Sequence, residues 1–297
     1  MSRWPLLFIC VGLIAAGLAY DQVSRTETVE ASQTVVEEEP IITPSVGTEP
    51  SLNAAWYCPL GSSEADGFAD HTVNVSNFAE TPAVANLSVL TEEGSRGGRR
   101  VELAPQSTIQ IQLSEIQSEA IAGAVVEATG GDVVVGHTVD TEHGSASGPC
   151  GTHVSNEWYF ASGIVGGEGT GDADFYLALM NPFPESASFS ASFQPDDRAP
   201  REPAELQGRV VPARSVVLVN VGDFVSRADE VAAAIRTGRG RLVVERLQVM
   251  DGGLGASGAS LQLGVPTPAN SWLLTAGRLH AEGDHRVTVY NLSLIHI

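Results

Sequence analysis

The side chains best suited to chemistry surround the last cysteine of the chain. Asp140, Glu142 and His143 precede Cys150, and His153 follows it. Carboxylates and imidazoles of this kind are common zinc ligands. Their spacings match no known zinc pattern, however, and a polar loop beside a disulfide would contain the same residue types. We therefore predict no metal site and no cofactor.

Two glycine-rich segments, 166–174 and 252–258, resemble loops that bind phosphate or calcium. A dinucleotide-binding loop must lead from a strand into a helix, whereas 166–174 leads into an alternating segment typical of a strand. A calcium loop would need more oxygen ligands at fixed spacing. Both segments are therefore interpreted as loops between strands.

The basic residues exclude further reaction classes. All 16 of them are arginine, so lysine-dependent Schiff bases, Ser–Lys nucleophile pairs and P-loop phosphate sites are ruled out. The sequence also lacks a G-x-S-x-G nucleophile elbow and an H-E-x-x-H helix. We predict no catalytic residue and no enzymatic activity. The net charge of −20 would repel phosphate backbones, so no nucleic-acid partner is expected.

The elements that must carry these residues are indicated by short runs of alternating apolar and polar residues. Such runs predict antiparallel strands with one buried face. Three runs, 71–77, 175–181 and 286–291, end in asparagine, and each follows a tryptophan that opens a repeat. We predict that the tryptophans pack in the repeat cores and that the asparagines form the same turn in each repeat. These residues are Trp56, Trp158 and Trp272, and Asn77, Asn181 and Asn291.

The repeat predicts the fold class and the domains. Six or so strands in about 100 residues suit a sandwich of immunoglobulin-like size. We expect an all-β protein, with tandem immunoglobulin-like antiparallel β-sandwich repeats after an N-terminal membrane helix and a disordered linker. The expected segments are a signal anchor or signal peptide (1–20), an acidic linker (21–53), repeat one (54–152), repeat two (153–268) and the truncated start of repeat three (269–297).

The N-terminus indicates a membrane location. Residues 4–20 form an uncharged run after Arg3. A membrane helix needs about 20 apolar residues and the core of a signal peptide about 7–15, so the run fits either an uncleaved anchor or a cleaved signal. With Arg3 on the cytoplasmic side, the body would lie outside the cell. We expect a single-pass membrane protein with an extracytoplasmic body, or a secreted protein if the signal is cleaved.

A disulfide between Cys58 and Cys150 fits this location. Outside the cell the two thiols would be oxidised, and the bond would join the ends of repeat one. It would close a loop of about 90 residues and stabilise the fold by about 4–5 kcal/mol in the chain-entropy picture. Two free buried thiols are the alternative.

The cysteines also take part in a wider resemblance. The chain resembles a family of actinobacterial secreted or membrane-anchored proteins catalogued only as a domain of unknown function. The resemblance extends over about residues 54 to 291 and rests on Trp56-Tyr57-Cys58-Pro59, the distant Cys150, Trp158-Tyr159-Phe160 and a strand that ends in Asn181-Pro182. It implies an N-terminal membrane segment and an envelope location. It implies no activity and no catalytic residue.

These patterns favour a membrane-tethered scaffold or interaction protein of the cell envelope. Its expected partners are the membrane, through the N-terminal helix, and an envelope protein or cell-wall polymer. A cell-wall or carbohydrate-binding module is the alternative, and an envelope enzyme is third. Exposed aromatic side chains would favour the second function, and an open cleft with converging histidines and carboxylates would favour the third.

Overall fold

The computed structural model describes residues 53–129, 132–166, 173–196, 198–252, 257–273 and 287–292. The chain divides into two compact units, Met1–Thr43 and Pro44–Ile297, and all described residues belong to the second. The predicted membrane segment 1–20 and almost all of the predicted linker 21–53 lie outside the described residues. Within the described ranges, no helix has the length and apolarity needed to cross a membrane.

The described chain is built from antiparallel strands and three short 3-10 helices, so the predicted all-β class is confirmed. The N-terminal strands are β1 (Asn53–Cys58), β2 (Asp70–Asn77), β3 (Ala83–Thr91), β4 (Gly94–Leu103), β5 (Ser107–Gln112), β6 (Gly123–Thr129), β7 (Val133–Thr141) and β8 (Gly144–Pro149). The C-terminal strands are β9 (Glu157–Phe160), β10 (Ala173–Asn181), β11 (Ala187–Pro195), β12 (Arg209–Val211), β13 (Ser215–Asn220), β14 (Val231–Arg239), β15 (Val243–Asp251) and β16 (Ser257–Leu263). The 3-10 helices are η1 (Leu113–Glu115), η2 (Ala204–Leu206) and η3 (Val221–Asp223).

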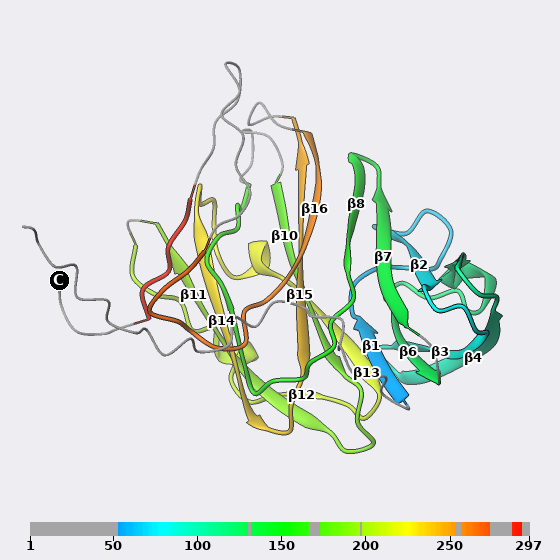
Figure 1. The fold of residues 1–297 in the computed structure, drawn as a ribbon. Helices are drawn as coiled ribbons and strands as arrows, with labels where there is room; N and C mark the ends of the chain where they lie inside the picture. The colour runs from blue at the N-terminus through cyan, green and yellow to red at the C-terminus, as the bar shows by residue number, and fades with distance from the viewer. Residues whose placement is uncertain are drawn as a thin grey trace, which may run out of the picture. The chain divides into compact units, whose positions relative to one another are not determined.

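These strands form four sheets of four strands each. Sheet I has the order β1-β6-β3-β4, and sheet II has the order β5-β2-β7-β8. Sheet III has the order β13-β10-β15-β16, and sheet IV has the order β12-β11-β14-β9. Every strand pairing within these four sheets is antiparallel, as expected for strands joined by short turns. Figure 1 shows β8 and β16 side by side, where sheets II and III meet.

The predicted tandem immunoglobulin-like sandwiches are wrong. The four small sheets are arranged as in a four-bladed β-propeller. The prediction assumed that each repeat buries its apolar face only against itself. Instead Leu60, Leu90 and Val139 from the N-terminal sheets belong to the same buried cluster as Phe175 and Phe189 from the C-terminal sheets. Alternation along a strand shows that one face is buried, but it does not show which sheet covers that face.

A second, smaller cluster lies among the strands of sheets I and II. Val73 and Val75 of β2 pack there with Leu87 of β3 and Val126 of β6. The side chains of β2 alternate between buried and partly exposed from His71 to Asn77, because successive residues of a strand point to opposite faces. The alternating run 71–77 therefore folds as its pattern indicates.

Strand β15 departs from alternation because it is covered on both faces. Val243, Val244, Glu245, Leu247 and Gln248 are all buried. Its neighbour β10 is also almost continuously buried from Leu177 to Asn181. Continuous apolar runs are typical of strands in the middle of a fold. This position places Glu245 in the interior, next to the N-terminal sheets.

Close packing joins the two sets of sheets near β6. A Cβ atom added at Gly123 would lie 2.6 Å from Cε of Met180, 2.8 Å from the carbonyl oxygen of Pro59 and 2.9 Å from Cγ2 of Val216. Real Cβ atoms do not approach other atoms this closely. Gly123 therefore allows β6 to pack against β10 and β13 without an intervening side chain.

Candidate functional site

The most unusual polar group of the described chain is a buried row of two histidines and one glutamate. His71 lies on β2 and His137 lies on the adjacent strand β7 of sheet II. Glu245 lies on β15 of sheet III. The exposed fractions of the three residues are 3%, 1% and 1%. Ionisable residues are rarely buried this completely unless they are paired, so the row needs an explanation.

Three hydrogen bonds connect the row from end to end. Nδ1 of His71 lies 2.8 Å from the carbonyl oxygen of Ala122. Nε2 of His71 lies 3.0 Å from Nδ1 of His137. Nε2 of His137 lies 2.9 Å from Oε1 of Glu245. We call His71, His137 and Glu245 the buried triad.

The chemistry of the end groups determines where the protons lie. The Ala122 carbonyl can only accept, so Nδ1 of His71 donates to it. If His71 is neutral, its Nε2 is then an acceptor, and Nδ1 of His137 donates to it. The last hydrogen bond, between His137 and Glu245, also needs one proton. The three bonds together therefore need three protons. Two neutral imidazoles and one neutral carboxyl group also hold three protons, so the triad has no net charge.

The environment of His71 supports its neutral state. Burial, and to a smaller extent the neighbouring His137, lower the pKa of His71 to about 3, although the hydrogen bond to Ala122 acts in the opposite direction. His71 therefore remains neutral over the physiological pH range. Space for its ring depends on Gly61, where an added Cβ would lie 2.5 Å from Cβ of His71.

The triad resembles the acid–base pairs of enzymes in composition, but a substrate cannot reach it. A general acid or base must reach a substrate directly or through one water. The side chains of His137 and Glu245 are 0% and 1% exposed, and the other end of the row is occupied by a backbone carbonyl. The arrangement can hold and release a proton and can join two sheets. It presents no nucleophile or base to solvent in the described part of the chain.

The two cysteines lie where the sequence predicts a disulfide. A disulfide joins Cys58, the last residue of β1, to Cys150, which directly follows β8. Both residues are almost completely buried. The bond connects sheet I to sheet II, and β8 pairs with the strand that carries His137.

Two of the three predicted core tryptophans are buried. Trp56 is 9% exposed and Trp158 is 3% exposed. Nε1 of Trp158 donates a 2.9 Å hydrogen bond to the carbonyl oxygen of Leu242. Trp272, by contrast, is 58% exposed, so the core position predicted for it is wrong.

Asn77 and Asn181 occupy equivalent corners. The side-chain amide of Asn77 donates to the carbonyl oxygens of Thr81 at 2.9 Å and Ala104 at 3.1 Å, and its oxygen accepts from the backbone N–H of Ala79 at 3.0 Å. Asn181 makes the corresponding set of bonds at the end of β10. Each asparagine therefore closes the turn after its strand.

The third predicted asparagine turn has a different setting. Residues 287–292, which contain Asn291, are not assigned to a strand. Val287 and Val289 are 53% and 81% exposed. The strand predicted at 286–291 is therefore not formed in the described part of this segment.

The residues that suggested zinc chemistry lie at the end of β7, in the β7–β8 turn and after β8. Nε2 of His143 contacts Oε1 of Glu142 at 3.4 Å, and Nδ1 of His153 is hydrogen-bonded to Thr152 at 2.9 Å. Across the described ranges, no group of three or more His, Cys, Asp or Glu residues is placed to hold a metal ion. Most of the loops 166–174 and 252–258 lie outside the described residues.

None of the three members of the buried triad was predicted from the sequence. Each of them is a titratable residue at a position where the pattern of the strand predicts an apolar side chain, and this mismatch was the signal in the sequence. His71 and His137 have the same parity as the buried valines of β2 and β7. Glu245 follows two buried valines on β15. A polar residue at such a position predicts a buried partner, although it does not say which one.

Comparisons with known proteins add little to this description. No family model matches the chain, and no curated protein matches it. Among solved structures, the chain is similar to the crystal structure of Thermotoga maritima 1070, with 13% sequence identity and a TM-score of 0.29. That match covers 34% of this chain and 94% of the other. A likeness at this level carries no argument about function.

Proposed function

We propose that the chain is a membrane-tethered scaffold or interaction protein of the cell envelope. The observation that carries the proposal is the Cys58–Cys150 disulfide. Structural disulfides persist in oxidising compartments and are rare in the cytosol of most organisms. The apolar run 4–20 supports a membrane tether, since it is uncharged and follows Arg3.

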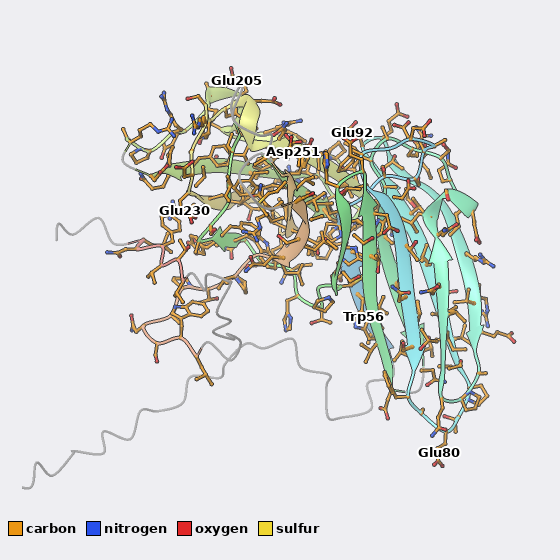
Figure 2. The ribbon with its side chains drawn as sticks, turned by 90° about the horizontal axis from the view of Figure 1, so that it is seen from above. Trp56, Glu80, Glu92, Glu205, Glu230 and Asp251 are labelled. Carbon is orange, nitrogen blue, oxygen red and sulfur yellow. A yellow bond between two sulfur atoms is a disulfide. The ribbon has the colours of Figure 1, made fainter. Side chains whose placement is uncertain are left out.

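The surroundings of the ionisable groups favour a scaffold over an enzyme. The histidines and the carboxylate that converge in the structure are sealed between sheets and do not line an open cleft. Figure 2 shows Glu80 and Glu205 projecting from the surface of the molecule. An acidic surface keeps a protein soluble and repels anionic polymers, so a protein partner suits this chain better than a polyanion.

The location can be tested by protease accessibility. Trypsin added to intact protoplasts that express the full chain should digest the body, because the body lies outside the membrane and contains many arginines. A cytoplasmic control protein should remain intact in the same sample. Protection of the body until the cells are lysed would contradict the proposal.

A cell-wall-binding module is the second candidate, because Trp272 is exposed. Exposed aromatic rings are suited to stacking on sugars or on partner surfaces. Purified full chain should be mixed with isolated cell walls and sedimented. A scaffold should stay in the supernatant. Sedimentation that Trp272→Ala abolishes and Phe78→Ala leaves unchanged would favour wall binding instead, since Phe78 is a second exposed aromatic residue.

A further inference from the structure

We propose that the buried triad is a proton-dependent tie that holds sheets II and III together and weakens as pH rises above neutrality. The tie crosses between the two sheets at one point only, the bond from His137 to Glu245. Its three hydrogen bonds need three protons between two acceptors, the Ala122 carbonyl and the Glu245 carboxylate. Removal of one proton breaks one of these bonds and leaves a net negative charge in the interior.

The number of protons in the unfolded chain gives the direction of the effect. In the unfolded chain, histidine titrates near pH 6.5 and glutamate near pH 4.3. Above about pH 7.5 the unfolded triad therefore holds two protons, one on each neutral imidazole, whereas the folded triad holds three. Because the folded state binds the extra proton, stability falls as pH rises in this range. The unfolding equilibrium constant should increase about tenfold per pH unit from this source alone.

Below neutrality the sign reverses. Between about pH 4.3 and pH 6.5 the unfolded triad holds four protons and an ionised glutamate. The folded triad still holds three, since His71 resists protonation down to a pKa of about 3. Stability therefore rises with pH in this range, and the contribution of the triad is largest near pH 6.5.

The strands around the triad carry few other titratable groups. Strands β5, β8, β13 and β16 carry none. The ionisable residues on the remaining strands of sheets II and III are Asp70 on β2, Asp140 on β7, Asp174 and Tyr176 on β10, and Arg246 and Asp251 on β15. The pKa of Tyr176 is raised to about 12 by burial and by Asp174 and Asp223, so this residue stays neutral in the tested range. Among the neighbours of His71, His137 lowers its pKa and the hydrogen bond to Ala122 raises it.

Glu245→Gln is the decisive substitution. The amide of glutamine can donate to Nε2 of His137 without any titratable proton, so both histidines stay neutral and all three hydrogen bonds remain. Folded and unfolded variant then hold two imidazole protons each above pH 7.5. We expect the unfolding equilibrium constant of the variant to be nearly independent of pH between 7.5 and 8.5, whereas that of the wild type increases about tenfold. Urea unfolding of the oxidised full chain measures both.

Glu205→Gln is the matched control, because Glu205 is an exposed carboxylate in η2. It removes the same charge from the protein and should keep the pH dependence of the wild type. Identical profiles for the wild type and Glu245→Gln between pH 7.5 and 8.5 would overturn the proposal. If Glu245→Gln does not fold, nitrogen NMR of the wild-type histidines decides. Protons on Nδ1 of both His71 and His137 at pH 8 support the tie, and an unprotonated Nδ1 of His137 at this pH refutes it, because the bond from His137 to His71 would then be lost.

Discussion

At the scale of single residues, the fold depends on buried polar side chains that satisfy backbone groups. Asn181 is fully buried, and its amide donates to the carbonyl oxygens of Glu185 at 2.8 Å and Pro212 at 2.9 Å. Its side-chain oxygen accepts from the backbone N–H of Phe183 at 3.1 Å. One side chain thus replaces the ladder partners that a strand loses where it turns.

Replacement of this asparagine should be costly. We expect Asn181→Ala to lower the free energy of unfolding by about 1–3 kcal/mol, because the carbonyl groups at the corner lose the donor that a buried side chain supplies. Urea unfolding followed by circular dichroism measures the change. Asn220→Ala serves as the control, since Asn220 accepts a single exposed hydrogen bond from Gly222. Equal losses of unfolding free energy in the two variants would show that the hydrogen bonds of Asn181 contribute no more than the single bond of Asn220.

At the scale of elements, the disulfide holds the end of β1 to the end of β8. Cys58 and Cys150 are separated by 92 residues, so the bond closes a long loop in the unfolded chain. The neighbouring backbone adds to this connection, since Tyr57 and Gly151 exchange two hydrogen bonds of 2.7 Å. The edges of sheets I and II are therefore joined both covalently and by hydrogen bonds.

Removal of the disulfide should destabilise the body without changing its fold. We expect Cys58→Ser combined with Cys150→Ser to lower the free energy of unfolding by up to about 4–5 kcal/mol. Reductant should lower the stability of the wild type and leave the double variant unchanged. Thiol labelling in denaturant without reductant checks the premise, and modification of both cysteines would disprove the bond.

At the scale of the whole described unit, one buried cluster extends through all four sheets. It includes Leu90 of sheet I, Val139 of sheet II, Phe175 of sheet III and Phe189 of sheet IV. The contact at Gly123 and the buried triad lie where the N-terminal and C-terminal sheets meet. A shared core couples the stability of the parts that it joins.

The four sheets should therefore unfold in a single cooperative step. We expect the slowest-exchanging amides of β2 and β7 to show the same opening free energy as those of β10 and β15, within about 1 kcal/mol. Native-state hydrogen exchange across a series of low urea concentrations measures these values. Independent folding units would appear as a lower opening free energy for one pair of sheets, and that result would argue against a shared core.

Much of the local structure could be read from the chain. The alternating runs at 71–77 and 175–181 correspond to β2 and β10, because alternation of apolar and polar residues favours a strand. The cysteines and the corner asparagines were also identified, since their roles follow from compartment and from turns close in sequence. These features depend on short-range physics that the sequence contains.

Only the tertiary structure brought together the residues of the triad. His71 and Glu245 lie far apart in the chain, and the sequence around either residue does not predict that the two come together. The packing of sheets II and III against each other, in addition to the packing of sheets I and II, creates the buried site where they meet. Alternation along a strand shows that one face is covered, but it does not show which sheet covers it. The arrangement of the sheets and the partners of the buried ionisable groups are therefore determined only by the tertiary structure.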